Sequence, residues 1–264
     1  MGLKAWVRRQ LSYYRSGRQL RRGSHALQTT EASHRERAKP GSRAEIINLL
    51  LGTFDRPATY LEIGVRRPED NFTRIEAAIK YGVDPGVEYL PNPVDFPLTS
   101  DAFFTALRAG KLLSDGQRFE VVFIDGLHLA EQVDRDIGNA LAHLAEDGFI
   151  VLHDCNPPTI FHNREDYDYR LTPAEGAWTG TTWKAYVKWR SRGDLYSCCV
   201  DTDYGIGILS RSLDFGRDRP RVSNSFYEYR VLEANRRDQL GLISPSEFAT
   251  LLGSHFPASN SEMR

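Results

Sequence analysis

The sequence has few cysteines and no long apolar run, and we expect no secretory leader. Its cysteines, Cys155, Cys198 and Cys199, are neither evenly paired nor arranged as CxxC. This pattern fits a reducing cytosol better than a disulfide scaffold or a structural zinc site, so we expect a cytoplasmic location. No segment approaches the roughly 18 apolar residues that a membrane span needs. The opening residues also lack the apolar core and the cleavage site of a secretory signal.

The glycine patterns that hold a diphosphate are also absent. After Gly64 the chain reads Val65-Arg-Arg-Pro68, so there is no GxGxxG to seat a pyrophosphate on a helix N-terminus. No Walker-type run of glycine and lysine occurs either. These absences argue against NAD and ATP as ligands.

The composition indicates one α/β domain with appendages. At 264 residues, of which 41% are hydrophobic, the chain can bury one substantial core. A formal net charge of -1 argues against a surface built as a whole for nucleic acid, and no nucleic-acid partner is expected. We predict a basic, partly disordered arm over 1–43, a main domain over 44–212 and a C-terminal helical extension over 213–264.

The predicted arm is strongly basic, with Glu31 and Glu36 as its only acids. One interpretation is a solvated leader with a short amphipathic helix near 5–14. The other is a peripheral contact with anionic lipid headgroups or with a phosphorylated substrate carrier. The basic residues are Lys4, Arg8, Arg9, Arg15, Arg18, Arg21, Arg22, Arg35, Arg37, Lys39 and Arg43.

Beyond the arm, apolar runs alternate with segments of helical periodicity. Strands are expected at 58–65, 81–85, 98–101, 119–125 and 148–153, followed by an antiparallel pair over 195–210. Helices are expected at 45–51, 71–80, 102–113, 129–144, 183–190, 225–237 and 245–252. This alternation predicts a doubly wound, mostly parallel sheet. The long stretch 157–180 lacks a clear period and is expected to cover a substrate.

Titratable pairs stand at the ends of two apolar strands. The run Phe119–Ile124 is followed by Asp125 and His128, and a second run ends on His153 and Asp154. Open α/β sheets bind their ligands at the carboxyl ends of their strands. We therefore predict that these side chains form a catalytic site, although such residues can also serve as helix caps.

Two further strand ends indicate a nucleoside ligand. Gly64 allows a close backbone approach, while Glu62 can accept hydrogen bonds. Asp84 follows Gly64 by twenty positions, where an acid can accept both hydroxyls of a ribose. A ligand with a ribose and no diphosphate, such as S-adenosylmethionine, fits these residues better than NAD or ATP.

Five motifs in this order resemble the class I S-adenosylmethionine-dependent methyltransferases, in particular the small-molecule O-methyltransferase branch that includes macrolide and cephalosporin-pathway enzymes. They are Leu61–Val65, Val83–Pro85, Thr99–Asp101, Phe123–His128 and Leu152–Asp154. The resemblance covers about 60–211 and implies a seven-stranded sheet with a reversed final strand. The chain departs from the family's glycine-rich first loop at Arg66, Arg67 and Pro68.

The resemblance also implies roles for individual residues. Glu62 and Gly64 would lie near the methionine moiety of the cofactor, Asp84 at the ribose, and Ser100 with Asp101 near the adenine, with Asp125 also beside the cofactor. In the macrolide enzymes, acids at the positions of Asp125 and Asp154 hold magnesium. His153 stands where the family often has an acid, and imidazole is a poor magnesium ligand, so a metal site of Asp125, His153 and Asp154 is left open.

Methyl transfer requires an in-line attack and removal of a proton from the acceptor hydroxyl. His128 is the candidate base, with Asp125 beside it; the alternative is a structural histidine at a helix N-terminus. Aromatic and acidic residues of the long loop could shape an acceptor pocket or only fix the loop to the body. They are Tyr167, Tyr169, Glu175, Trp178 and Trp183.

The leading hypothesis is an O-methyltransferase acting on a sugar, a secondary metabolite or another small hydroxylated molecule. Two alternatives stay open: a hydroxylase-pathway component of the same fold, and a cofactor-binding module without turnover. A homo-oligomer that pairs through the C-terminal helices is also compatible with the sequence.

Overall fold

The computed structural model describes residues 2–114 and 116–257. Its first half contains α1 (Leu3–Arg22), α2 (Ser24–Arg37), α3 (Arg43–Leu51), β1 (Thr59–Ile63), the 3-10 turns η1 (Pro68–Asp70) and η2 (Phe72–Arg74), β2 (Ile79–Val83), α4 (Ser100–Arg108) and β3 (Phe119–Ile124). Its second half contains α5 (Ala130–His143), β4 (Leu144–Leu152), α6 (Thr182–Arg190), β5 (Tyr196–Val200), β6 (Ile206–Ser210), α7 (Tyr229–Ala234), α8 (Arg236–Leu240), β7 (Leu242–Ile243) and α9 (Pro245–His255).

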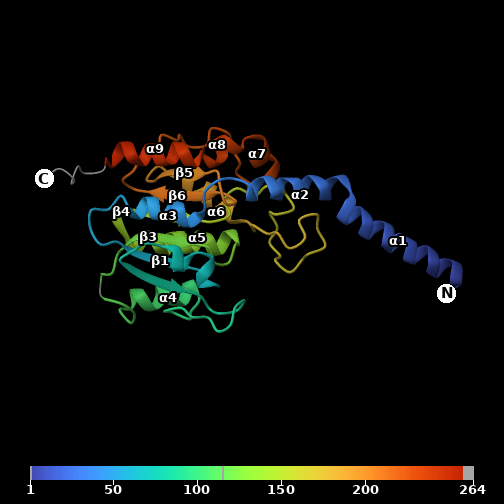
Figure 1. The fold of residues 1–264 in the computed structure, drawn as a ribbon, viewed down its shortest axis with the longest axis horizontal. Helices are drawn as coiled ribbons and strands as arrows, with labels where there is room; N and C mark the ends of the chain where they lie inside the picture. Colours follow the sequence, from blue (N-terminus) through green and yellow to red (C-terminus); the bar gives the residue numbers. More distant parts are fainter. Residues whose placement is uncertain (1, 115, 258–264) are drawn as a thin grey trace.

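Seven strands form one sheet in the order β2-β1-β3-β4-β6-β5-β7 (Figure 1). The neighbours from β2 to β4 are parallel, β6 is antiparallel to both β4 and β5, and β7 runs parallel to β5. The predicted seven-stranded, mostly parallel α/β sheet with one reversed strand is therefore confirmed, although that strand was expected to be the final one. The reversed strand is β6, and the two-residue β7 adds an edge that the sequence analysis did not predict.

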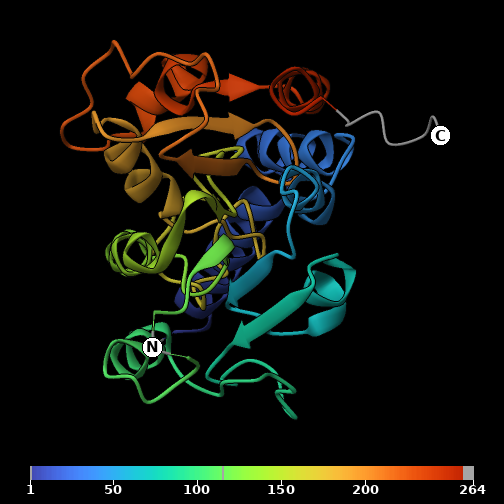
Figure 2. The same cartoon turned by 90° about the vertical axis from the view of Figure 1, so that its left-hand side faces the viewer.

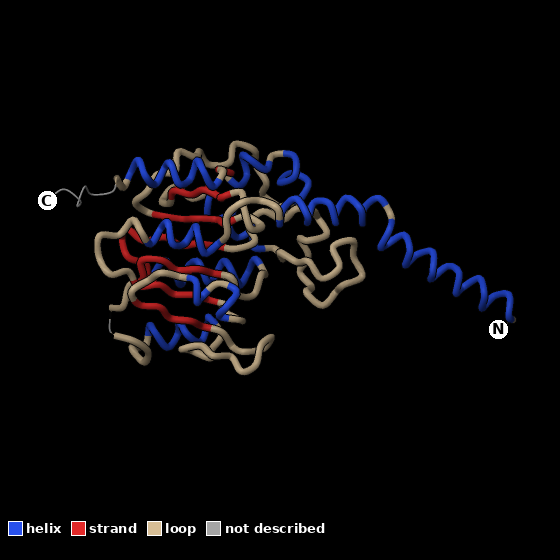
Figure 3. The backbone as a smooth tube through the Cα atoms, viewed as in Figure 1, coloured by secondary structure: helices blue, strands red, loops and turns tan. Residues whose placement is uncertain are grey.

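Helices cover both faces of the sheet, as Figures 2 and 3 show. One core joins the sheet to α4, α5 and α6 through residues such as Phe103, Ile137 and Trp183. The other joins it to α3 and α9 through residues such as Ile47 and Phe248. Strands buried on both faces read as continuous apolar runs, which is why β3 and β4 are recognisable in the sequence.

Backbone ladders continue beyond the strand ends and bring the predicted site residues into register. The N–H of Gly64 donates to the carbonyl of Val83, that of Asp125 to Ile63, and that of His153 to Ile124. Because β1, β3 and β4 are parallel, these residues lie side by side along the border of the sheet where the carboxyl ends of the strands meet. We call this the carboxyl edge.

Two expected elements are not present. The segment 71–80 is not an α-helix. Ile79 and Lys80 already pair with β1, and the backbone groups of the preceding residues form hydrogen bonds with side chains instead of with one another. Lys80 Nζ donates to the carbonyls of Phe72 and Ile75, while Asn48 bonds with the backbone of Arg74 and Glu76.

The expected strand at 98–101 is the start of a helix instead. The Thr99 side chain accepts from the N–H of Ala102 and caps α4, which begins at Ser100. Only an isolated bridge between Val83 and Phe96 lies where a further strand would pair. The expected helix at 225–237 is replaced by the shorter α7 and α8, with Asn235 between them.

Residues 3–37 form two helices with different surroundings. α2 is tied to the body: Ser33 Oγ lies 2.8 Å from His162 Nε2, and Glu36 accepts from the N–H of Tyr204 at 3.0 Å. α1 buries no residue and projects beyond the carboxyl edge (Figure 1).

Within the described residues, no helix has the length and apolar character to cross a bilayer. The domain boundaries at 43 and 212 stay predictions.

Gly64 fixes the close approach of β1 and β3 at the carboxyl edge. It adopts φ +89°, and a Cβ there would collide with the backbone of Gly126 and with the carbonyl oxygen of Asp125. We expect Gly64→Ala to lower the free energy of unfolding by at least about 2 kcal/mol, measured by urea denaturation. Gly253→Ala is the matched control, because its added methyl group meets no neighbour within 4 Å. Equal stability of the two variants would contradict this account.

Candidate functional site

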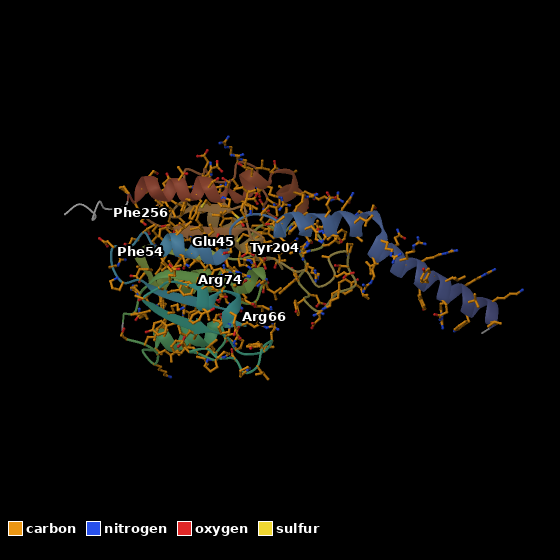
Figure 4. All side chains as sticks on the ribbon, in the orientation of Figure 1. Glu45, Phe54, Arg66, Arg74, Tyr204 and Phe256 are labelled. Carbon is orange, nitrogen blue, oxygen red and sulfur yellow. The ribbon has the colours of Figure 1, made fainter. Side chains whose placement is uncertain are left out.

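The structure brings Asp125, His128, His153 and Asp154 together at the carboxyl edge. Asp125 and His153 directly follow β3 and β4, which are neighbours in the sheet. His128 lies just before α5, and Asp154 adopts φ +59°, a conformation that aspartate tolerates better than most residues. The predicted convergence of the two strand ends is therefore present. Figure 4 labels Arg66 and Tyr204, which lie at this side of the body, opposite Phe54 and Phe256.

Asp125 and Asp154 flank the His128 ring. Nε2 of His128 lies 3.2 Å from Asp125 Oδ1, and its Nδ1 lies 2.8 Å from Asp154 Oδ2. One donor atom from each of the three residues fits within a mutual distance of 4.8 Å. These three residues therefore form the set in which potential ligand atoms converge.

His153 takes a bridging position beside this set. Its Nδ1 lies 3.0 Å from Asp125 Oδ1 and 3.5 Å from Asp154 Oδ1. On the other side of the ring, Nε2 lies 3.3 Å from Asp203 Oδ1. The group predicted from the sequence contained His153, whereas the three residues that converge here contain His128.

Arg43 and Asp203 complete the cluster, and the sequence analysis missed both. Arg43 Nη1 donates to Asp125 Oδ2 at 2.7 Å and lies 3.1 Å from His153 Nδ1. Asp203 Oδ2 accepts from the backbone N–H of Arg43 at 3.1 Å, at the first residue of α3. A carboxylate is favourable at a helix N-terminus, whereas a cation there needs compensation. Asp203 and Asp125 provide it.

The mutual pairing of these groups shifts their pKa values. Burial opposes the charged form of His128 and His153, but the adjacent carboxylates outweigh it and raise the pKa of each imidazole to about 10. Burial alone would also raise the pKa of Asp125, but His153 and Arg43 hold it well below its usual range. The pKa of Asp203 falls to about 2, because His153 and Arg43 outweigh its burial. All four groups are therefore charged at neutral pH.

The contact between His128 and Asp154 is short without being a hydrogen bond. His128 Nδ1 is buried and has no hydrogen-bond partner, although Asp154 Oδ2 is 2.8 Å away. Two atoms that share a cation at coordination distance lie about 3 Å apart with their lone pairs directed at the ion rather than at each other. The geometry of this pair therefore fits shared coordination of a metal ion.

Glu62 lies in a second, drier environment on β1. Its side chain is buried, with Oε2 accepting from Tyr60 Oη at 2.6 Å and from Asn71 Nδ2 at 2.9 Å. Burial raises the pKa of Glu62 to about 7, against the lowering effect of these two hydrogen bonds. The sequence analysis did not predict Tyr60 and Asn71 as partners of Glu62. Tyr60 could have been found, because side chains two residues apart on a strand point to the same face of the sheet.

Asp84 organises the loops after β1 and β2. Its Oδ2 accepts from the N–H of Arg66 at 2.8 Å, and Oδ1 accepts from the N–H of Gly86 at 2.7 Å. Each oxygen keeps a further lone pair, so both can still accept a ligand hydroxyl.

Ser100 and Asp101 lie in the first turn of α4 at the same edge. Gln132 Nε2 on α5 contacts both side chains, at 3.1 Å from Ser100 Oγ and 3.3 Å from Asp101 Oδ1. It also donates to Asp136 Oδ1, and burial raises the pKa of Asp136 to about 6. The predicted adenine-side residues are thus held by α5.

The long loop, which was expected to cover a substrate, lies over His128. Trp178 stacks on the His128 ring with centroids 4.9 Å apart and planes 6° from parallel. Thr181 donates its N–H to the carbonyl of His128, and its side chain accepts from the N–H of Ala130 at the start of α5. Tyr167 contacts Trp178 edge-on. The loop therefore fixes both the ring and the backbone of His128.

The comparison of the sequence with protein families bears directly on this edge. Residues 31–155 match a family model described as a methyltransferase domain. This part of the chain is a methyltransferase domain. It contains every residue predicted for the site, and with the sheet order it confirms the class I resemblance. No curated protein matches the sequence.

Solved structures similar to this chain include three methyltransferases. The O-methyltransferase from Bacillus cereus in complex with SAH has a TM-score of 0.40 and 13% identity, covering 70% of this chain and 89% of that one. The O-methyltransferase TomG from Streptomyces achromogenes, in complex with SAM, has a TM-score of 0.38 and 14% identity, covering 76% of this chain and 94% of that one. A Podospora anserina methyltransferase bound to SAH has a TM-score of 0.41 and 14% identity, covering 80% of this chain and 97% of that one. Likenesses this distant carry no argument about the chemistry of this chain.

Arg43 should be important for stability, because without it Asp125 and Asp203 each lose one of their cationic partners. We expect Arg43→Ala to lower the free energy of unfolding by about 3 kcal/mol, measured by urea denaturation. Arg56→Ala is the control, since Arg56 is 40% exposed, pairs with Asp147 at the surface and lies 3.3 Å from Glu120, so that it should contribute only about 1 kcal/mol. A smaller loss for Arg43→Ala than for Arg56→Ala would contradict the assigned role.

Proposed function

We propose that the chain transfers a methyl group from S-adenosylmethionine to a hydroxyl oxygen of a small molecule, such as a sugar or a secondary metabolite. The observation that carries the proposal is the convergence of Asp125, His128 and Asp154 at the carboxyl edge of a methyltransferase domain. A charged, buried cluster at a strand edge is typical of a catalytic site rather than of a structural one.

The cofactor would lie along the β1 and β2 half of the carboxyl edge. Asp84 has a free lone pair on each oxygen for the ribose hydroxyls, and Ser100 with Asp101 would border the adenine. Glu62 would border the methionine moiety from its dry pocket. Gly64 and Asp125 belong to this surface as well, because the backbone of Gly64 packs against the Asp125–Gly126 peptide.

Methyl transfer needs the acceptor oxygen in line with the sulfonium and its proton removed. His128 is the proposed proton acceptor, with Asp125 positioning its ring. Asp125 and Asp154 stabilise the protonated imidazole, so a proton taken from the acceptor would be held firmly. The same pairing means that His128 must first lose a proton to act as a base. Trp178 keeps the ring in place and limits access of water to one of its faces.

A divalent cation fits the donor set of Asp125, His128 and Asp154, as the unpartnered His128 Nδ1 indicates. When bound, such an ion would polarise the acceptor hydroxyl and lower its pKa, and His128 would then be a ligand of the ion rather than the base, because a neutral imidazole has only one lone pair to give. One imidazole and two carboxylates suit a transition-metal ion such as Mn²⁺ better than Mg²⁺, which prefers oxygen ligands. The converging set has one histidine, which favours methyl transfer over an oxygenase that needs two histidines and one carboxylate.

Two expectations go with this proposal. Cys155, Cys198 and Cys199 are all free and buried, which supports a reducing compartment such as the cytoplasm. Pairing of the C-terminal helices in a homo-oligomer stays a prediction.

Methyl transfer is tested with the purified full chain. We expect calorimetry to detect binding of S-adenosylmethionine but not of NAD, and a panel of small hydroxylated acceptors to include one that releases S-adenosylhomocysteine. With that acceptor, His128→Gln should lower kcat by about a hundredfold or more. His255→Gln, an exposed histidine on α9, should leave kcat unchanged. Normal turnover of His128→Gln would disprove the base, and failure to bind S-adenosylmethionine would overturn the proposed function.

Metal binding is tested without turnover. We expect Mn²⁺ added to EDTA-treated protein to bind with release of protons, because an ion at His128 must displace the imidazole proton. Calorimetry in buffers of different ionisation enthalpy measures that release.

Variants then identify the ligands. Asp154→Asn and His128→Gln should each weaken Mn²⁺ binding at least tenfold, whereas the exposed control Asp55→Asn should bind normally. A larger loss for His153→Gln than for His128→Gln would restore the set predicted from the sequence. Unchanged binding in Asp154→Asn would exclude this metal site.

A further inference from the structure

The helix α1 barely touches the rest of the described chain: it follows on from α2 at Gly23, and Arg21 in its last turn forms an exposed ion pair with Glu175 of the long loop. None of its residues is buried, and Leu3, Trp6 and Tyr14 are 76%, 49% and 68% exposed. An isolated helix that packs on nothing gains no stability from burial of its side chains. In Figure 1 it extends beyond the carboxyl edge, away from the sheet and from α3 to α9. Its surface is therefore free to bind another molecule.

Apolar and aromatic side chains gather on one side of α1. Leu3, Val7, Leu11 and Tyr14 recur at helical spacing, and Trp6 borders the same stripe. Exposed apolar side chains that occur singly are ordinary, but a continuous stripe marks an interaction surface. Tryptophan and tyrosine beside such a stripe suit the boundary between water and a lipid phase, because each ring has an apolar body and a polar group.

Positive charge flanks the apolar stripe. α1 has no acidic residue, and its seven basic residues give it a charge opposite in sign to that of the whole chain, which is -1. Lys4, Arg8 and Arg15 line one flank of the stripe, whereas Arg9 lies on the opposite face of the helix. A helix with an apolar face beside a basic flank, and with no acidic residue, is typical of segments that lie in the plane of an anionic bilayer.

The charge also decides between the candidate occupants. A second copy of α1 would bring a second set of seven positive charges against the first, which opposes pairing. Nucleic acid would satisfy the arginines but leave Leu3, Val7 and Leu11 exposed to water. An anionic lipid surface satisfies the charges and the apolar stripe together.

We propose that α1 docks the protein on an anionic lipid bilayer through this stripe and the basic flank formed by Lys4, Arg8 and Arg15. The remaining residues of the body stay in water, and α2 keeps α1 attached to the carboxyl edge through Ser33 and Glu36. The proposal depends on neither S-adenosylmethionine nor turnover.

Co-sedimentation of the full chain with vesicles tests the proposal. We expect binding to phosphatidylcholine vesicles that contain about one third phosphatidylglycerol, weaker binding as salt rises, and little binding to phosphatidylcholine alone. Arg8→Gln/Arg15→Gln should weaken binding about thirtyfold, since each basic residue near an anionic surface contributes about fivefold. Trp6→Ala/Leu11→Ala should weaken it at least tenfold through lost apolar contact.

Matched variants elsewhere on the surface serve as controls. Phe226→Ala removes an aromatic side chain that is 89% exposed, and Arg230→Gln/Arg237→Gln removes two exposed charges. Both should bind vesicles like the unmodified chain. No binding to anionic vesicles, or equal binding by the α1 variants and the controls, would overturn the proposal. So would a concentration-dependent dimer that the Trp6→Ala/Leu11→Ala variant loses, because the stripe would then serve a second copy.

Discussion

Charge compensation at the carboxyl edge is the constraint on which the rest of the structure depends. Three carboxylates are placed there within contact of three cationic groups, largely out of water. Any one of them left without a partner would be costly, because a buried charge keeps its desolvation penalty after its attraction is lost. The members are Asp125, Asp154 and Asp203 with Arg43, His128 and His153. Protonated imidazoles balance the cluster, and a bound cation could replace their protons.

The fold supports this cluster from several distant parts of the chain. Gly64 lets β1 and β3 approach closely enough for Asp125 to face the β4 end. α3 supplies Arg43, while the turn between β5 and β6 supplies Asp203. The long loop holds His128 by a stacked ring and by backbone hydrogen bonds. A site assembled from so many elements can keep its geometry only while each of them is packed in place.

The sequence predicted what depends on local pattern and missed what depends on tertiary contact. The apolar runs of β3 and β4 and the acids after them were recognisable, and parallel pairing then required their ends to meet. Arg43 could not be assigned, since it stands in a basic segment where one arginine resembles the next. The helix expected at 71–80 failed because Asn48 and Lys80 satisfy the backbone there from outside the segment.

Titration of the histidine rings by NMR tests the central claim most directly. In protein freed of metal with EDTA, and with His128→Gln and His153→Gln to assign the signals, the account predicts two imidazoles that stay protonated at pH 8 with pKa values near 10. Their carboxylate partners are the reason. Two rings that lose their protons near the ordinary value of about 6.5 would contradict the compensated cluster, and with it the role given to Asp125 and Asp154.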